Sequence, residues 1–342
     1  MPYALPQMTR RIGIDLGTTN VRVYVPRRGI VVQEPAVVAL GLDDHRILAI
    51  GQAAKEMLGR TPDTIVASQP VRDGVIADFR VTEALLRIVL ERAGGSAVRF
   101  LRPDVMVSVP AGITSTERRA VLEAALHAGA RRVYLVKQPV AAAIGAGLPI
   151  AEASGHMIVH IGGGTVETAV ISLGGIVASA SARVGGFRLD AAVIEYVRKK
   201  LGLAIGEQTA EELKMTIGSA LPVEEERSLE IRGRDVATGL PREATMTTNR
   251  VTEALQEELE TIAQTVRQVL QETPPELAAD IIDTGIILTG GSAYLRNIDK
   301  LLAKTTMVPC TIADDPQRCV IQGIGMALEN LGVYRRSLVS TK

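Results

Sequence analysis

The sequence predicts an α/β protein made of two similar lobes, each with a mixed sheet flanked by helices. Apolar strand-like segments alternate with amphipathic helical segments, which favours sheets covered by helices on both sides. A unit of strand, glycine-rich turn and hairpin occurs near the start and again in mid-chain, which indicates an internal duplication. The 342 residues, 46% of them hydrophobic, are enough for two buried cores.

The two copies of the duplicated unit run over 12–32 and 158–178. In each copy an apolar strand enters a polar, glycine-containing turn, and a β-hairpin follows. The first turn is 17–20 and the second is 162–165. Because no long linker separates the two halves, we expect the lobes to share a cleft.

Helices and further strands lie between and after these copies. The segment Thr114-Ser115-Thr116-Glu117 is a capping box that begins a helix to about His127. The segment Thr209-Ala210-Glu211-Glu212 has a similar pattern and predicts the start of another helix. Apolar residues at helical spacing predict a third helix over 251–272, which Pro274-Pro275 ends. Further strands are predicted at 105–109, 133–136 and 286–288.

The composition argues against several classes of protein. The 38 basic and 38 acidic residues give zero formal net charge, so no nucleic-acid surface is expected. Cys310 and Cys319 have neither metal-site nor disulfide spacing and are expected to be free thiols. Residues 1–11 lack the apolar core of a signal peptide. The least polar stretch, 140–151, falls short of the ~18 apolar residues of a spanning helix, so we expect a cytoplasmic protein.

Three glycine-rich turns follow apolar strands directly: 17–20, 162–165 and 290–292. Glycine lets the backbone approach a phosphate closely, and successive N–H groups form a nest for an anion. One such turn is commonly only a tight connection. Two duplicated turns and a third of different type predict phosphate binding. The chain has no GxxxxGK[ST] loop and no GxGxxG after a strand, which excludes a Walker-type NTPase and a Rossmann dinucleotide site.

A set of longer motifs resembles the MreB-type bacterial actins, in order and without large gaps from about residue 11 to about residue 331. These motifs are IGIDLGTTN (12–20), RDGVIADF (72–79), VPAGITSTERRAVLEAALHAGA (109–130), PVAAAIGAGLP (139–149), IGGGTVETAVISLGGIV (161–177), IGEQTAEELKMTIGSA (205–220), GRDVATGLP (233–241), TPPELAADI (273–281) and ILTGGSAYLRNID (287–299).

The resemblance implies an actin-like duplicated fold with a cleft for ATP or GTP and Mg²⁺. It places lobe I at 1–146 plus 316–342 and lobe II at 147–315. By position, the implied nucleotide contacts are Gly17, Thr18, Thr19 and Asn20 in the first phosphate loop, Gly162, Gly163, Gly164 and Thr165 in the second, Glu211 and Lys214 at the ribose and base, and Gly290, Gly291 and Ser292 in the adenosine loop. Asp15 resembles the carboxylate that holds hydrated Mg²⁺ through water. From the residues alone, the Glu211–Lys214 spacing is also that of an ordinary surface ion pair.

The implied catalytic residues Gln138, His160 and Thr165 depart from the family at two positions. The family places an acid just before the second loop, where this chain has His160, and a Glu before Pro, where it has Gln138. Eukaryotic actins have Gln at the second of these positions and still hydrolyse ATP. Imidazole offers one acceptor nitrogen in place of two anionic oxygens, and its cation would pair with phosphate.

We therefore expect nucleotide binding with impaired turnover, at most a weak ATPase or GTPase. The alternative is that the His160 side chain points away and the site works normally. A further departure is Phe187 after Gly185-Gly186, where the family usually has an acid; Asp190 remains.

Two apolar residues, Phe100 and Leu101, lie between Arg99 and Arg102 in a loop near 97–103. At the family's loop position they would enter a membrane surface while the arginines face anionic headgroups. The alternative is that they begin a buried strand.

The resemblance as a whole implies a cytoskeletal protein that polymerises with itself into filaments. It would lie peripherally at the inner face of the cytoplasmic membrane with proteins of the cell-wall and shape complex, and organise cell shape and wall synthesis. The alternative function is a phosphotransfer enzyme of the sugar-kinase type on the same superfold.

Overall fold

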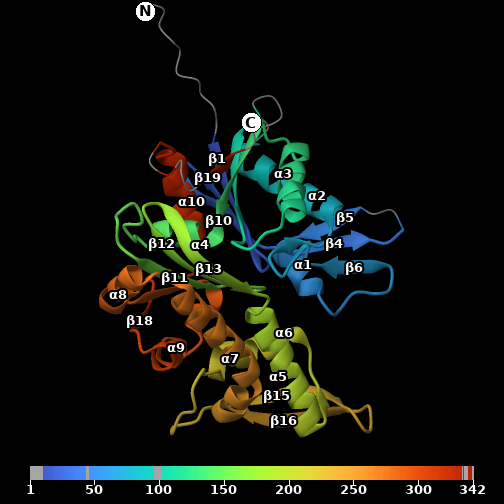
Figure 1. The fold of residues 1–342 in the computed structure, drawn as a ribbon. Helices are drawn as coiled ribbons and strands as arrows, with labels where there is room; N and C mark the ends of the chain where they lie inside the picture. The colour runs from blue at the N-terminus through green and yellow to red at the C-terminus, as the bar shows by residue number, and fades with distance from the viewer. Residues whose placement is uncertain (1–10, 44–45, 96–101, 333, 335–337, 341–342) are drawn as a thin grey trace, which may run out of the picture. The chain divides into compact units, whose positions relative to one another are not determined.

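The computed structural model describes residues 11–43, 46–95, 102–332, 334 and 338–340 (Figure 1). The chain divides into two compact units, one formed by Met1–Leu148 with Arg318–Lys342 and the other by Pro149–Gln317. The lobes inferred from the resemblance divide at 146/147 and 315/316, and the compact units divide at 148/149 and 317/318. The chain thus leaves the first unit once and returns to it with its last helix.

The first unit contains a six-stranded mixed sheet in the order β19-β10-β9-β1-β2-β3. Strands β1, β9 and β10 run parallel to one another, and β1, β2 and β3 form an antiparallel meander. The bounds are β1 Arg11–Leu16, β2 Asn20–Val25, β3 Gly29–Pro35, β9 Asp104–Val109, β10 Arg132–Lys137 and β19 Leu338–Ser340.

Helices cover both faces of this sheet. Residues of α2 and α3 pack with Ile12 and Ile14 of β1 in one hydrophobic cluster, while Gly13 faces Ile324 of α10 on the other face. The predicted capping box is confirmed, since the Thr114 side chain and the Glu117 side chain each bind the other's backbone at the start of α3. The helices are α2 Phe79–Gly94, α3 Ser115–His127, α4 Gln138–Gly145 and α10 Cys319–Glu329.

The first unit also has two small sheets. The sheet β5-β4-β6 packs against the short helix α1, and β7 pairs with β8. Their bounds are β4 Val38–Gly41, β5 Ile47–Ile50, α1 Gln52–Met57, β6 Ile65–Ser68, β7 Val71–Arg72 and β8 Val75–Ile76.

The second unit repeats the plan with a five-stranded sheet in the order β13-β12-β11-β17-β18. Strands β11, β12 and β13 form an antiparallel meander, and β11, β17 and β18 run parallel. The order β17-β11-β12-β13 therefore matches β9-β1-β2-β3 of the first unit, which confirms the duplication. The bounds are β11 His156–Ile161, β12 Val166–Ser172, β13 Gly175–Ala182, β17 Ile286–Thr289 and β18 Cys310–Ile312.

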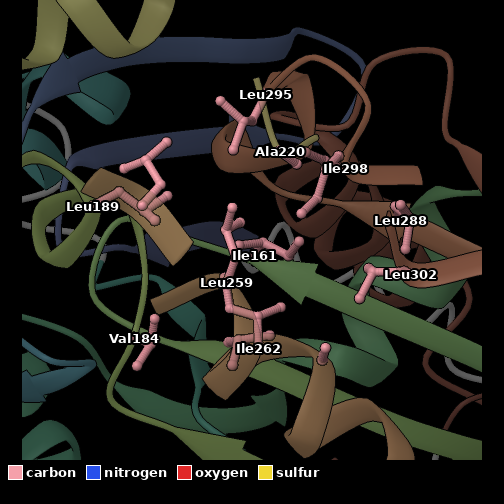
Figure 2. Packing of buried hydrophobic residues seen from close by; sticks show 14 of the residues in the cluster. Ile161, Val184, Leu189, Ala220, Leu259, Ile262, Leu288, Leu295, Ile298 and Leu302 are labelled. Atoms are coloured by element: carbon pink, nitrogen blue, oxygen red, sulfur yellow. The ribbon is translucent and has the colours of Figure 1, made fainter. Parts of the chain in front are cut away.

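The remaining elements of the second unit enclose its core. Figure 2 shows residues of β11, α5, α7 and α9 in this core, among them Ile161, Leu189, Leu259 and Ile298. A three-stranded sheet in the order β14-β15-β16 joins this core through Leu203, Ile231 and Met246. The bounds are α5 Gly186–Leu201, β14 Leu203–Ala204, α6 Glu207–Ile217, β15 Ser228–Asp235, β16 Pro241–Thr247, α7 Thr248–Glu272, α8 Pro275–Thr284, η2 Gly291–Tyr294 and α9 Ile298–Thr306.

The structure corrects one predicted helix start and confirms one predicted long helix. The start of α6 was predicted wrongly: the helix begins at Glu207, with Gly206 at its N-cap, and Thr209 lies inside its first turn. The long helix predicted over 251–272 is confirmed and begins slightly earlier, at Thr248. Among the described residues, no helix is both long and apolar enough to cross a lipid bilayer.

Helices α4 and α10 pack with their backbones almost in contact. A Cβ atom added to Gly323 of α10 would lie 1.8 Å from the carbonyl oxygen of Ala141 in α4, and one added to Gly145 of α4 would lie 1.8 Å from the carbonyl oxygen of Cys319. No flexible side chain can move aside at either place, because the obstructing atoms are backbone. Only glycine permits this approach, which joins the returning C-terminal helix to the rest of the first unit.

We expect Gly323→Ala to destabilise the protein. Ala in place of a helical Gly ordinarily stabilises by up to about 1 kcal/mol. Here the overpacking against α4 should reverse the sign and lower the free energy of unfolding by about 1–3 kcal/mol. Guanidinium denaturation followed by circular dichroism measures the change. Gly332→Ala is the matched control, since a Cβ there meets nothing within 4 Å; equal stability of the two variants would contradict this account.

Candidate functional site

The two predicted phosphate loops are the same turn in the two units. The Gly17 N–H donates to the Asn20 carbonyl at 3.1 Å, and the Gly162 N–H donates to the Thr165 carbonyl at 2.8 Å. Each turn follows a strand that is parallel to its inner neighbour, so each lies at the carboxyl edge of its sheet, where α/β proteins commonly bind ligands. A Cβ on Gly17 would lie 2.9 Å from the Asn20 carbonyl oxygen, so the first turn leaves little room for a side chain.

The first loop is tied to neighbouring segments of its own unit. The Thr18 hydroxyl accepts from the Gly74 N–H at 3.2 Å, and the Thr19 carbonyl accepts from the Ala36 N–H at 2.9 Å. Gln138 is buried at the first position of α4, directly after β10 and therefore at the same carboxyl edge as the loop. The expected first-loop residues and Gln138 thus belong to one edge of one sheet.

Asp15, the predicted carboxylate of the first unit, is buried and engaged on both oxygens. Its Oδ2 lies 3.3 Å from Nη1 of Arg22, its antiparallel partner on β2. Its Oδ1 accepts from the Ser108 hydroxyl at 2.9 Å. The side chains of Asp15 and Arg22 are 7% and 8% exposed, so the ion pair is almost completely removed from water.

The second loop is held by the N-terminus of α5. The N–H groups of Gly186 and Phe187 donate to the carbonyls of Gly162 and Gly163 at 3.0 and 2.9 Å. The helix has no side-chain cap, because these loop carbonyls satisfy two of the N–H groups that open every helix. A Cβ on Gly185 would lie 2.6 Å from the Gly162 carbonyl oxygen, so glycine at this position lets helix and loop meet.

The adenosine-loop residues contact the same turn from another side. The Ser292 hydroxyl donates to the Gly162 carbonyl at 3.1 Å. Gly290 has φ 90°, and a Cβ there would lie 2.2 Å from the Ile161 carbonyl oxygen, so glycine is required twice over. Gly291 is exposed and begins η2. The turn at 290–292 therefore lies against the turn at 162–165.

Lys214 reaches this network from α6. Its Nζ donates to the Gly186 carbonyl at 3.0 Å and lies 2.7 Å from Asp190 Oδ1. Burial raises the pKa of the Asp190 carboxyl above its ordinary value, outweighing the lowering by Lys214, and the charge of Glu211 adds to the rise. Asp190 is therefore a partner of Lys214 and not a cap of α5.

His160 belongs to a row of polar residues that crosses four strands. The ladders place it opposite Glu167 of β12 and opposite Thr289 of β17, with Ser181 of β13 opposite Glu167. The Ser181 hydroxyl donates to Glu167 Oε1 at 2.6 Å, and His160 Nδ1 lies 3.2 Å from Thr289 Oγ1. Glu167 and Thr289 are fully buried, and His160 is half-buried.

Thr289 is a hydrogen-bond partner of His160 across the ladder. Thr289 Oγ1 donates to the Val159 carbonyl at 3.4 Å, and in the tautomer with the proton on Nδ1 it also accepts from His160. The Nε2 edge faces the loop: a Cβ on Gly162 would lie 3.6 Å from it. In that tautomer the neutral ring presents an acceptor beside the second turn, and the cation presents a donor.

Sequence reasoning missed the buried partners Arg22, Ser108, Glu167 and Thr289, and it named Asp190 without finding its pairing with Lys214. Arg22 and Glu167 follow their first-strand partners by the same interval, 15 to 22 and 160 to 167, which the hairpin register sets. That interval is the signal that would have found them. The predicted membrane residues Phe100 and Leu101 lie outside the described residues.

Comparison with known proteins gives the family. The model of the MreB/Mbl protein family matches residues 9–336. This chain belongs to the MreB/Mbl family. It is 50% identical over 333 residues to the cell shape-determining protein MreB of Escherichia coli (strain K12), which covers 96% of each sequence.

Solved structures agree with this family assignment. MreB5 of Spiroplasma citri bound to AMPPNP superposes with a TM-score of 0.92 at 37% identity, covering 97% of this MreB/Mbl chain and 99% of that one. The same Spiroplasma protein bound to ADP superposes with a TM-score of 0.90 at 38% identity, covering 95% and 98%. The actin-like fold inferred from the resemblance is therefore confirmed.

Proposed function

We propose that this MreB/Mbl chain binds an adenine nucleotide. The observation that supports the proposal best is the convergence at Gly162: the carbonyl of this one residue accepts from the N-terminus of α5 and from Ser292, and Lys214 is joined to it through Gly186. The turn at 162–165, a lysine and the turn at 290–292, which belong to separate elements, are thereby held together. The Spiroplasma relatives, which share the fold, are bound to AMPPNP and to ADP.

The proposed contacts follow from the chemistry of the groups. Backbone N–H groups of 17–20 and 162–165 suit phosphate oxygens, and Lys214 adds a positive charge near the second turn. Glu211 and Lys214 would meet the ribose and base, together with Gly290, Gly291 and Ser292. GTP remains the alternative ligand to ATP.

A variant of Gly185 tests the site. In Gly185→Ala the new methyl group would push the 162–163 carbonyls away from α5, so we expect nucleotide affinity to fall by about tenfold or more, or ~1.4 kcal/mol. Titration with a fluorescent ADP analogue measures it. Gly175→Ala is the control from the same unit, since a Cβ there comes no nearer than 3.8 Å to another atom. Unchanged affinity in Gly185→Ala would count against this site.

The proposal extends to catalysis through His160. Nucleotide hydrolysis depends on polar groups that position water and stabilise charge in the transition state. An imidazole held by Thr289 offers one nitrogen beside the loop, where the resemblance places two carboxylate oxygens. We infer that binding is retained while turnover is slow, at most a weak ATPase or GTPase, with Gln138 and Thr165 as the other catalytic candidates.

We expect His160→Asp to raise the rate of phosphate release by about 10²-fold, the usual size of one transition-state contact. A phosphate-release assay at saturating ATP measures this rate. His127→Asp, at an exposed histidine of α3, is the control and should leave the rate unchanged. A fast wild-type rate that His160→Asp does not alter would disprove the impairment.

We further propose that the chain assembles into filaments with itself and acts in cell shape and wall synthesis. These filaments would lie at the inner face of the cytoplasmic membrane, in contact with proteins of the shape complex. Support comes from the family: the Escherichia coli relative is named for determining cell shape. Insertion of Phe100 and Leu101 into lipid stays a prediction, and the sugar-kinase alternative gains no support from the family match.

Light scattering and negative-stain microscopy with ATP, GTP or no nucleotide test assembly. We expect filaments whose amount depends on the nucleotide, because binding should stabilise one conformation over another. Gly185→Ala should assemble less at a limiting nucleotide concentration, whereas Gly175→Ala should assemble like wild type. Persistently monomeric protein with every nucleotide would contradict a cytoskeletal role.

A further inference from the structure

Each phosphate loop of this chain is flanked by a ladder pair that places an acid opposite a basic residue. In the first unit the pair is Asp15 and Arg22, and in the second it is His160 and Glu167. The residue on the strand that enters the loop is the acid in the first unit and the base in the second. In both units, therefore, the acid next to the loop lies opposite a basic residue.

The Arg22 member of the Asp15–Arg22 pair cannot lose its positive charge. The guanidinium stays protonated at all physiological pH values, and both side chains are more than nine-tenths buried. Ser108 donates to the other carboxylate oxygen, so all the negative charge of Asp15 is already opposed within the protein. A buried ion pair of this kind presents little net field to an incoming cation.

This arrangement does not fit the Mg²⁺ role implied for Asp15. Mg²⁺ is a hard cation that binds through carboxylates, waters and phosphates. A carboxylate that holds hydrated Mg²⁺ must offer it negative charge, and Arg22 cancels that charge at 3.3 Å. Within 11–43, 46–95 and 102–332, no group of three or more His, Cys, Asp or Glu side chains is placed to hold a metal ion.

Arg22 also retains an unused donor. Its Nε is buried and has no hydrogen-bond acceptor among the described residues. An unsatisfied buried donor on a charged group is costly. An oxyanion is the ligand that guanidinium binds most strongly. Arg22 is thus a fixed cation with spare donor capacity, two strand positions beyond the first phosphate loop.

The second unit leads to the same conclusion. Glu167, opposite His160, is fully buried and accepts from Ser181, so its carboxylate faces protein and not solvent. The strand that enters this turn has His160 at the matching position, and an imidazole lacks the carboxylate oxygens that Mg²⁺ prefers.

We propose that Arg22 neutralises Asp15, so that this carboxylate neither holds hydrated Mg²⁺ nor repels the phosphates, and nucleotide affinity is nearly independent of Mg²⁺. The inference rests on the proposed nucleotide site and concerns only how the charge of the phosphates is balanced there. The ion pair fixes the guanidinium beside Asp15, where the two opposite charges cancel.

The test is equilibrium titration of the full chain with a fluorescent ADP analogue, in excess Mg²⁺ and in excess EDTA. For wild type we expect the two Kd values to agree within about threefold, below ~1 kcal/mol. In Arg22→Leu the uncovered Asp15 charge should repel phosphate unless a cation intervenes, so Kd in EDTA should exceed Kd in Mg²⁺ by about tenfold. Arg22→Lys, which keeps the charge, should behave like wild type.

The outcomes separate the inference from the site itself. If wild type binds only in Mg²⁺, and Arg22→Leu shows the same ratio, the role of Arg22 is overturned while nucleotide binding stands. If wild type binds in neither buffer, the proposed function fails. Should Arg22→Leu fail to fold, the ratio of the wild-type Kd values in EDTA and in Mg²⁺ still decides. In the double variant Asp15→Asn, Arg22→Leu, which removes both charges, Kd should again be independent of Mg²⁺.

Discussion

The proposed nucleotide site of the second unit depends on the close approach of backbone segments at Gly162. The carbonyl of this residue accepts from Gly186 and Ser292, and the neighbouring Gly163 carbonyl accepts from Phe187. Such contacts need glycine at Gly185 and Gly290, where a Cβ would lie 2.6 and 2.2 Å from backbone oxygen atoms. The N-terminus of α5, the turn at 162–165 and the turn at 290–292 are therefore in contact, and none of them can move without the others.

The buried ion pair near the turn at 162–165 fixes the position of a side chain and does not add much stability. Removing Asp190 and Lys214 from water costs free energy that their attraction at 2.7 Å offsets only in part, and the raised pKa of Asp190 reflects that cost. What the pair achieves is geometric. It holds the Lys214 ammonium against the Gly186 carbonyl, next to the loop, where a flexible surface lysine would occupy many rotamers.

The sequence predicted local features well and partners between distant segments poorly. Both turns at 17–20 and 162–165, the capping box at Thr114 and the long helix before Pro274 are set by residues close together in the chain, and each was found. The start of α6 failed because Thr209 imitates a capping residue although Gly206 occupies the N-cap. Thr289 could not be paired with His160 from sequence, since 129 residues separate them and only the parallel ladder joins them.

The two units share a backbone arrangement, and the acidic and basic residues of the matching ladder pair exchange strands. In both, the residue two positions before the loop glycine lies opposite the residue seven positions further along, and a hydroxyl from the next parallel strand, Ser108 or Thr289, lies on its other side. The acid stands on the first strand in one unit and on the second strand in the other. The geometry of the turn thus sets which side chains lie opposite each other. Burial requires only that a buried polar or charged side chain has a partner. A change at one ladder position, such as an acid replaced by His160, can therefore be tolerated by the fold while it alters which ions the loop attracts.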